Sequence, residues 1–371
     1  MAKKLKILLL GEYSNYFNNL AHGLRELNHE VTLANNGDLF KNFNRDIDLS
    51  VNIDNLYVKT FFRIIKENLA INKMKGFDIV QIINPNVFAA IANNIYLYKK
   101  ILKHNRSVFL SAVGDDYYWW QAYRQDKFTK SPHLGFLYDS NKEKAHWETF
   151  KGLIDANVFL AHNCTAIIPG SISYHIPYRH FKNCTPIILQ PITIPKEQSP
   201  LIDHTKLEVI TVYHGAQLGR YAFKGTPAID IALANLRKLN RSDLNIIRTD
   251  SLPFDQYLQV IGKAHILIDQ TNFIEPTMNA LTSMLDGKVV LGGCEPIFME
   301  SHQLKEPPLV NIQNDPSSIE AAIIDLLDNR HKMNEFSSRA RDYVIRKHDS
   351  VKIAQQFLNC WRKYDSNSVD K

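Results

Sequence analysis

Cysteine is scarce in this sequence, and its positions exclude two classes of protein. The 371 residues contain four cysteines, at Cys164, Cys184, Cys294 and Cys360, and no two of them lie close together in the chain. This spacing is typical neither of a disulfide framework nor of a zinc site. A reducing compartment fits the pattern best, and we expect the protein to be cytoplasmic.

Long apolar runs are also missing. No stretch approaches the ~20 apolar residues that a membrane-spanning helix requires. The run Ile7–Leu10 near the N-terminus is too short for a signal sequence, and it reads as a buried first strand. We therefore expect a soluble protein, or at most one that binds the inner face of a membrane as a peripheral protein.

Ligand sets for metals and modules for nucleic acids are not recognisable. His162, His175 and His180 lack metal-ligand spacing, and the pair Asp115-Asp116 has no evident third ligand. The net charge of +6 is compatible with nucleic-acid binding, but no known binding module is present. We predict no metal, no other cofactor and no nucleic-acid partner.

What the sequence does contain is a repeated order of strand and helix. Asp78–Ile83 leads to a helix near Val87–Lys103, and Leu207–Tyr213 leads to a helix near Ala228–Leu239. Such alternation predicts parallel sheets covered by helices on both faces, with ligands at the carboxyl ends of the strands. Because 371 residues exceed one ordinary core, we predict an α/β fold class: two doubly wound, Rossmann-like domains that face a central cleft.

A proline-rich stretch separates the two predicted domains. Four prolines fall within Cys184–Pro200, where they disfavour helix and stiffen an extended linker. We place the boundary near Ile194. The prediction is a first domain at 1–193, a second at 194–350, and a last helix at 351–371 that crosses back to the first domain.

Positive charge is concentrated in the first half of the chain. Residues 1–190 contain 23 Lys and Arg against 16 Asp and Glu. Part of the excess lies in Tyr57–Lys75, where cations alternate with aromatic and aliphatic side chains. Such a helix either docks on an anionic membrane surface or, more commonly, packs an apolar stripe on the core and exposes a charged face.

A basic, glycine-rich loop follows the strand Leu207–Tyr213 and precedes a helix. It consists of a histidine, three glycines and two cations: His214, Gly215, Gly219, Arg220, Lys224 and Gly225. Helix N-termini favour anions, an arginine can bond two phosphate oxygens, and a lysine adds a compact charge. The loop fits a diphosphate. The alternative is a solvated turn whose cations face water.

Three other features each have two interpretations. Gly293 and Glu295 follow the strand Val289–Leu291 and form either a ligand loop, which we favour, or a tight turn with a surface carboxylate. His214 either donates to a phosphate or sugar hydroxyl, or is a buried, hydrogen-bonded histidine. The run Tyr117–Trp120 belongs to the core or stacks on a sugar or lipid headgroup, and we expect at least one ring at the cleft.

Taken together, these features resemble the GT-B glycosyltransferases, specifically the retaining group 4 family. The resemblance rests on Gly-Arg-x-x-x-Lys-Gly at 219–225, on Asp269-Gln270, and on Gly287 before a later strand. It covers almost the whole chain. It implies an acceptor-binding first domain, a second domain that binds a nucleotide-sugar donor, and metal-independent sugar transfer of the hexosyltransferase type.

The resemblance also implies roles for individual residues. Arg220 and Lys224 would hold the diphosphate and offset charge on the leaving group, with Asp116 as a third catalytic candidate. The donor-binding candidates are His214, Gly215, Gly219, Asp269, Glu275, Thr277, Asn279, Thr282, Gly293 and Glu295. The acceptor-binding candidates are Gly11, Asp115, Tyr117 and Trp119.

One family motif, a Glu-x7-Glu pair, is not reproduced. Counting back from Gly287 places Thr282 at the second glutamate and Ile274 at the first, with Glu275 displaced by one residue. A threonine cannot hold two ribose hydroxyls as a carboxylate does. We therefore predict a variant donor loop at 275–279.

The predicted function is transfer of a sugar from a nucleotide-diphosphate sugar to a hydroxyl of a glycan or lipid-linked acceptor. The resemblance implies retention and a place in surface-polysaccharide biosynthesis. In the retaining reaction the leaving phosphate takes the acceptor's proton, which fits the lack of a recognisable triad. Two alternatives stay open on the same fold: a non-catalytic sugar-nucleotide-binding or partner subunit, and a sugar-nucleotide 2-epimerase.

Overall fold

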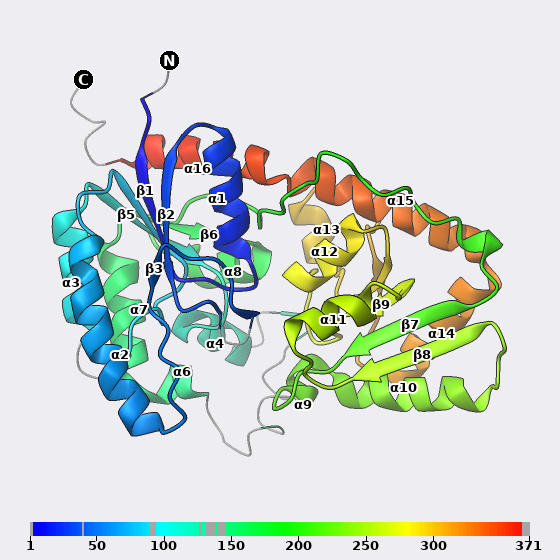
Figure 1. The fold of residues 1–371 in the computed structure, drawn as a ribbon. Helices are drawn as coiled ribbons and strands as arrows, with labels where there is room; N and C mark the ends of the chain where they lie inside the picture. The colour runs from blue at the N-terminus through cyan, green and yellow to red at the C-terminus, as the bar shows by residue number, and fades with distance from the viewer. Residues whose placement is uncertain are drawn as a thin grey trace. The chain divides into compact units, whose positions relative to one another are not determined.

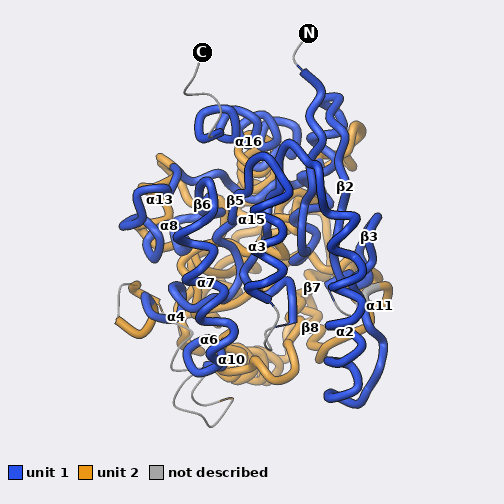
Figure 2. The backbone as a smooth tube through the Cα atoms, turned by 90° about the vertical axis from the view of Figure 1, so that its left-hand side faces the viewer, with its two compact units in different colours: residues 1–122, 144–193, 348–371 blue, residues 123–143, 194–347 orange. Residues whose placement is uncertain are grey.

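The chain divides into two compact units (Figures 1 and 2). The computed structural model describes residues 3–38, 41–89, 94–125, 128–130, 139 and 145–365. Unit 1 comprises Met1–Ala122, Lys144–Thr193 and His348–Lys371, and unit 2 comprises Tyr123–Glu143 and Ile194–Lys347. Residues 123–143, which the sequence predicts as part of the first domain, are grouped with unit 2.

Unit 1 is built on a six-stranded parallel sheet in the order β3-β2-β1-β4-β5-β6. Its strands are β1 (Lys6–Leu10), β2 (Glu30–Asn35), β3 (Ile47–Asp48), β4 (Ile79–Ile82), β5 (Ser107–Ala112) and β6 (Ala166–Pro169). Ile7–Leu10 are fully buried. Leu8 and Leu10 join a core cluster with α3 and α7, and because strand side chains alternate, Ile7 and Leu9 point to the other face of the sheet.

Helices of unit 1 lie along this sheet (Figure 1). They are α1 (Tyr16–Glu26), α2 (Leu56–Ala70), α3 (Asn94–His104), α4 (Tyr117–Arg124), α6 (His146–Thr149), α7 (Lys151–Asn163), α8 (Ile172–Tyr178) and α16 (Ser350–Tyr364), with a 3-10 turn at Ile71–Lys73. Among the described residues, no helix is both long enough and apolar enough to cross a bilayer.

The last helix, α16, packs in unit 1 although the chain reaches it from unit 2. Trp361 is buried and donates from its indole nitrogen to Oε1 of Gln81 on β4, at 2.9 Å. Gly23 of α1 faces the start of α16 so closely that an added Cβ would lie 2.0 Å from the Ser350 carbonyl oxygen. The absence of a side chain at position 23 thus permits this helix contact.

Unit 2 has a five-stranded parallel sheet in the order β11-β10-β9-β7-β8. Its strands are β7 (Ile210–Gly215), β8 (Leu244–Thr249), β9 (Ile266–Ile268), β10 (Val289–Gly292) and β11 (Val310–Asn311). Its helices are α9 (Tyr221–Lys224), α10 (Thr226–Lys238), α11 (Phe254–Ile261), α12 (Met278–Leu285), α13 (Pro296–Ser301), α14 (Pro316–Asp328) and α15 (Arg330–Lys347), with a 3-10 turn at His204–Lys206. The prediction of two α/β units with parallel sheets is therefore confirmed.

Candidate functional site

Three loops meet at the carboxyl edge of the unit 2 sheet. They follow β7, β9 and β10, which are neighbours in the sheet. The backbone N–H of Thr271 donates to the Lys224 carbonyl at 3.0 Å, and that of Glu295 donates to the Ile274 carbonyl at 2.9 Å. The loops that carry most of the predicted donor residues are thus joined by backbone hydrogen bonds.

Glycines permit this close packing of loops. At Gly225, φ is +81° and an added Cβ would lie 1.8 Å from Oγ1 of Thr271. At Gly293, an added Cβ would lie 1.8 Å from the Phe273 carbonyl oxygen. Side chains at these two positions would push the loops apart, so glycine is required at both for the observed arrangement.

The basic loop ends in the short helix α9. The guanidinium carbon of Arg220 lies 4.0 Å from the ring centroid of buried Phe223, a cation–π contact. The Asp139 carboxylate accepts hydrogen bonds from the backbone N–H groups of Ala222 and Phe223, at 2.9 and 2.8 Å. An anionic group of the chain itself therefore occupies backbone amides within the predicted diphosphate loop.

Asp269, just after β9, is close enough to Lys224 for their charges to interact. Burial raises the pKa of Asp269, and the Lys224 charge and hydrogen bonds from Thr277 and Asn279 oppose the rise. Oγ1 of Thr277 donates to Asp269 at 2.8 Å. Asp269, Thr277 and Lys224 thus form one polar group beside the basic loop.

His214 is buried at the end of β7. Nδ1 lies 3.0 Å from the Ile268 carbonyl oxygen, and Nε2 lies 3.3 Å from Oγ1 of Thr226. A carbonyl only accepts, so Nδ1 carries the proton and Nε2 accepts from the threonine hydroxyl. Burial lowers the pKa of His214 to about 4, so the ring is neutral. This geometry matches the buried, hydrogen-bonded histidine of the two sequence interpretations.

Glu295 is surrounded by donors. Its carboxylate lies 2.8 Å from Nζ of Lys130 and accepts from Thr129, Asn311 and Gln313 at 3.1–3.3 Å. Burial would raise its pKa, but the bonds from Lys130, Asn311 and Gln313 outweigh burial and lower it. An ionised carboxylate has about four acceptor positions, and these four contacts use them. Its observed role is to hold residues 129–130.

The polar side chains of the variant donor loop and of the helix after it differ in burial and in their hydrogen-bond partners. Glu275 is buried, whereas Oγ1 of Thr282 donates to the Met278 carbonyl one helical turn earlier, at 2.9 Å. Asn279 accepts a hydrogen bond from Tyr257 and donates to Asp269 at 3.4 Å. Gly215 and Gly219 flank the start of the basic loop, and Gly219 has φ +76°.

The predicted acceptor residues lie in unit 1. Gly11 and Asp115 follow β1 and β5, at the carboxyl edge of that sheet. Tyr117 is half-buried, whereas Trp119 is buried in the interior and not at the surface. Gly11 has φ +96° and borders a small pocket. The pocket also includes Glu12, Tyr13, Asn35, Asn36, Leu49, Ile83, Asn86 and Val87.

Asp116 is buried and fully engaged. Oδ1 accepts from the backbone N–H of Trp119 at 2.8 Å, which caps α4, and Oδ2 accepts from the Tyr178 hydroxyl at 2.7 Å. Asn157 in turn donates to Tyr178 at 2.8 Å. Burial raises the pKa of Asp116 to about 7 despite these hydrogen bonds. The observed role of Asp116 is therefore that of a helix cap.

Sequence reasoning missed several residues of both units. Lys130 and Asp139 are remote in sequence from the unit 2 loops that they contact, and no local pattern marks them. Glu12 lies two residues after β1 and accepts from the backbone N–H of Asn18 at 2.9 Å. Its place at a strand end was a usable signal. Among the described residues, no group of three or more His, Cys, Asp or Glu side chains could hold a metal.

No family model and no curated protein matches this sequence. Solved structures do resemble its fold over nearly the full length. Anabaena HepE in complex with UDP-glucose is 11% identical, with a TM-score of 0.60, over 96% of this chain and 100% of that one. A Thermosynechococcus elongatus sucrose-phosphate synthase is 12% identical, with a TM-score of 0.61, over 96% and 98%.

A further similar structure comes from Listeria monocytogenes and is assigned as a UDP-N-acetylglucosamine 2-epimerase. It is 11% identical, with a TM-score of 0.59, over 98% of this chain and 97% of that one. Likeness at such low identity shows the fold alone. It confirms the predicted two-domain GT-B fold class and does not establish the retaining group 4 family.

Proposed function

We propose that the protein binds a nucleotide-diphosphate sugar in unit 2 and transfers its sugar to a hydroxyl of a glycan or lipid-linked acceptor. The observation that carries this proposal is the polar group formed by the Arg220–Lys224 loop and Asp269. It lies at the carboxyl edge of a parallel sheet, where such folds bind ligands. Two proteins of similar fold, Anabaena HepE and S. aureus MnaA, were solved with UDP or UDP-glucose.

The chemistry assigns the two cations a role in leaving-group departure. As the sugar–phosphate bond breaks, negative charge grows on the diphosphate, and prepositioned cations stabilise it. Retention of configuration, metal independence and a role in surface-polysaccharide biosynthesis belong to the same proposal. They are supported by the family resemblance of residues 219–225 and 269 only.

A non-catalytic sugar-nucleotide-binding subunit is the second candidate. The hydroxyl of Thr282 is bonded to its own helix, so the position that resembles the family's second glutamate offers no carboxylate. A sugar-nucleotide 2-epimerase has the weaker basis, because its support is likeness of fold. Product analysis separates the three: a glycosylated acceptor, an unchanged donor, or an epimerised donor.

Thermal shift with UDP-, GDP- and dTDP-sugars tests the donor site. A true ligand at 100 times its Kd stabilises the folded state by about 2.7 kcal/mol. We expect Arg220→Ala to abolish the thermal shift. It should also remove about 3 kcal/mol of transition-state stabilisation, which lowers kcat/KM more than a hundredfold. Arg237→Ala, on the exposed end of α10, is the matched control. If no nucleotide stabilises the wild type, the proposal fails.

A further inference from the structure

Helix α2 exposes its apolar side to solvent, whereas an amphipathic helix usually packs that side on the core. Among the described residues, sixteen large hydrophobic side chains are exposed, and seven of them belong to this one helix. They are Leu56, Tyr57, Val58, Phe61, Phe62, Ile65 and Leu69. The expectation that this segment packs its apolar stripe on the core is therefore wrong.

The exposed side chains form one continuous face. At 100° per residue, six of the seven, all except Leu56, fall within an arc of about 140°. Their exposed fractions run from 41% for Ile65 to 87% for Tyr57. No acidic side chain lies within the arc. Its polar side-chain groups are the Tyr57 hydroxyl and the half-buried Asn68 amide, which donates to the Ile64 carbonyl of the same helix. Exposed apolar patches of this kind mark interaction surfaces.

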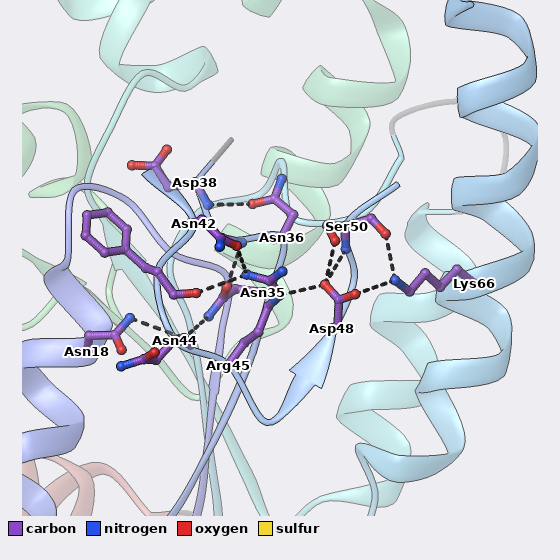
Figure 3. A network of polar contacts seen from close by, with 12 residues as sticks. Asn18, Asn35, Asn36, Asp38, Asn42, Asn44, Arg45, Asp48, Ser50 and Lys66 are labelled. Atoms are coloured by element: carbon purple, nitrogen blue, oxygen red, sulfur yellow. Dashed lines mark hydrogen bonds and ion pairs between the residues drawn. The ribbon is translucent and has the colours of Figure 1, made fainter. Parts of the chain in front are cut away.

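Polar contacts hold the opposite side of α2 against unit 1. Glu67 is buried, accepts from the backbone N–H of Ala89 at 3.0 Å and pairs with Arg63 at 2.7 Å. Lys66 reaches Asp48 at 2.7 Å and the Ser50 carbonyl at 2.6 Å (Figure 3). The helix is thus anchored by its charged side, which leaves the apolar side outward.

The anchors belong to a wider network at the ends of β2 and β3 (Figure 3). Arg45 donates to Asp48 at 2.6 Å and to the Asn42 side chain at 2.9 Å, and Asn35 donates to the Asn44 carbonyl at 3.2 Å. Hydrogen bonds from Lys66, Ser50 and Arg45 outweigh burial and keep the pKa of Asp48 low, so Asp48 stays ionised for Lys66. This network fixes which side of α2 faces outward.

Charge identifies the kind of partner. Residues 56–75 contain five cations and one acid. Arg63 pairs with that acid and Lys66 with Asp48, which leaves Lys59, Lys73 and Lys75 as uncompensated positive charge beside the apolar arc. A protein interface would normally provide many hydrogen-bonding groups within the contact, whereas this arc provides two, and one of them, the Asn68 amide, is bonded to its own helix. Apolar and aromatic side chains flanked by lysines suit an anionic bilayer.

We propose that α2 docks its apolar face into the surface of an anionic lipid bilayer and holds unit 1 there. With 15 residues, the helix lies in the headgroup region and does not span the membrane. This inference does not depend on the donor site in unit 2. Failure of one therefore leaves the other intact, because nucleotide-induced stabilisation can be measured without lipid.

Vesicle co-sedimentation of the full chain tests the docking. We expect binding to vesicles of phosphatidylglycerol and phosphatidylcholine, and much weaker binding to pure phosphatidylcholine. Phe61→Glu with Leu69→Glu should lower binding at least tenfold. The matched control, Ile231→Glu with Leu239→Glu on exposed apolar positions of unit 2, should leave it unchanged. Lys73→Ala and Lys75→Ala should each lower binding about fivefold, and high salt should reproduce that loss.

Hydrogen exchange of the wild type supplies a readout that needs no variant: vesicles should protect the amides of α2. Absence of sedimentation and of this protection overturns the proposal. Equal binding to neutral and anionic vesicles overturns its electrostatic part. Sedimentation velocity tests whether a second copy of the chain binds this face instead. If the wild type is a dimer and Phe61→Glu with Leu69→Glu makes it a monomer, the face is a dimer interface and the proposal is overturned.

Discussion

At the scale of single residues, carboxylates of both units that are buried or half-buried are held by specific donors. Glu295 binds Lys130, Asp139 binds two backbone amides of α9, and Asp116 caps α4. Each of these contacts joins residues that a local sequence pattern does not connect, except the cap at Asp116. Asp139 and Asp116 lead to predictions of different kinds, one about ligand binding and one about pH.

Asp139 occupies two amides of α9 that the proposed diphosphate would otherwise bind. We expect Asp139→Ala to tighten nucleotide binding by about tenfold, because it frees two N–H donors and removes a negative charge from an anion site. Isothermal titration with UDP measures the change, and Asp255→Ala, an exposed acid on α11, serves as the control. Weaker binding by Asp139→Ala would mean that this carboxylate instead keeps the loop in its binding conformation.

Asp116 makes stability depend on pH in a predictable direction. Its folded pKa, about 7, lies above the unfolded value near 3.9, so the folded state holds the extra proton. The resulting stability, on the order of 4 kcal/mol, is fully present below about pH 4 and is lost as pH rises through 7. Urea unfolding across pH 4–8 should show that stability falls more steeply with rising pH in the wild type than in Asp116→Asn. The variant keeps part of the slope, because burial also raises the pKa of Glu12 to about 7. Asp54→Asn, at an exposed position of unit 1, should keep the wild-type slope.

At the scale of secondary-structure elements, the sequence predicted which helices and strands are present better than it predicted which side of a helix faces solvent. Apolar runs such as Ile7–Leu10 identified parallel strands because both faces of these sheets are buried. The periodicity of α2 identified a helix but not its outward side, because that side is decided by Glu67 and Lys66 and their distant partners. The positions of Arg220 and Asp269 in the loops after β7 and β9 were predictable from the sequence. Lys130 was not, since its partners are far along the chain.

The contact between α1 and α16 depends on Gly23. In an exposed helix, Gly→Ala stabilises by roughly 1 kcal/mol. Here the new Cβ would lie 2.0 Å from the Ser350 carbonyl, so we expect Gly23→Ala to destabilise unit 1 by about 2 kcal/mol instead. Denaturant unfolding measures the change in the free energy of unfolding and therefore its sign. Gly262→Ala, where the nearest atom would be 3.2 Å away, is the control and should be close to neutral. A stabilised Gly23→Ala would show that the helices readily move apart.

At the scale of the whole molecule, the chain crosses between its two units more often than the domain prediction anticipated. Residues 123–143 leave unit 1 to join unit 2, and α16 returns to unit 1 after α15. Cutting the chain at one linker would therefore leave each unit incomplete. Spectroscopic probes offer a way to observe the units separately in the intact protein.

All four tryptophans, Trp119, Trp120, Trp147 and Trp361, belong to unit 1, so tryptophan fluorescence reports the unfolding of unit 1 while far-UV circular dichroism reports both units. If unit 2 alone holds the donor diphosphate, a nucleotide sugar stabilises unit 2 and not unit 1. We expect the ligand to raise the midpoint of a dichroism transition and to leave the fluorescence midpoint unchanged. Arg220→Ala should remove the dichroism shift. An equal rise in both midpoints would contradict this division, because it would mean that the units unfold as one or that unit 1 also binds the donor.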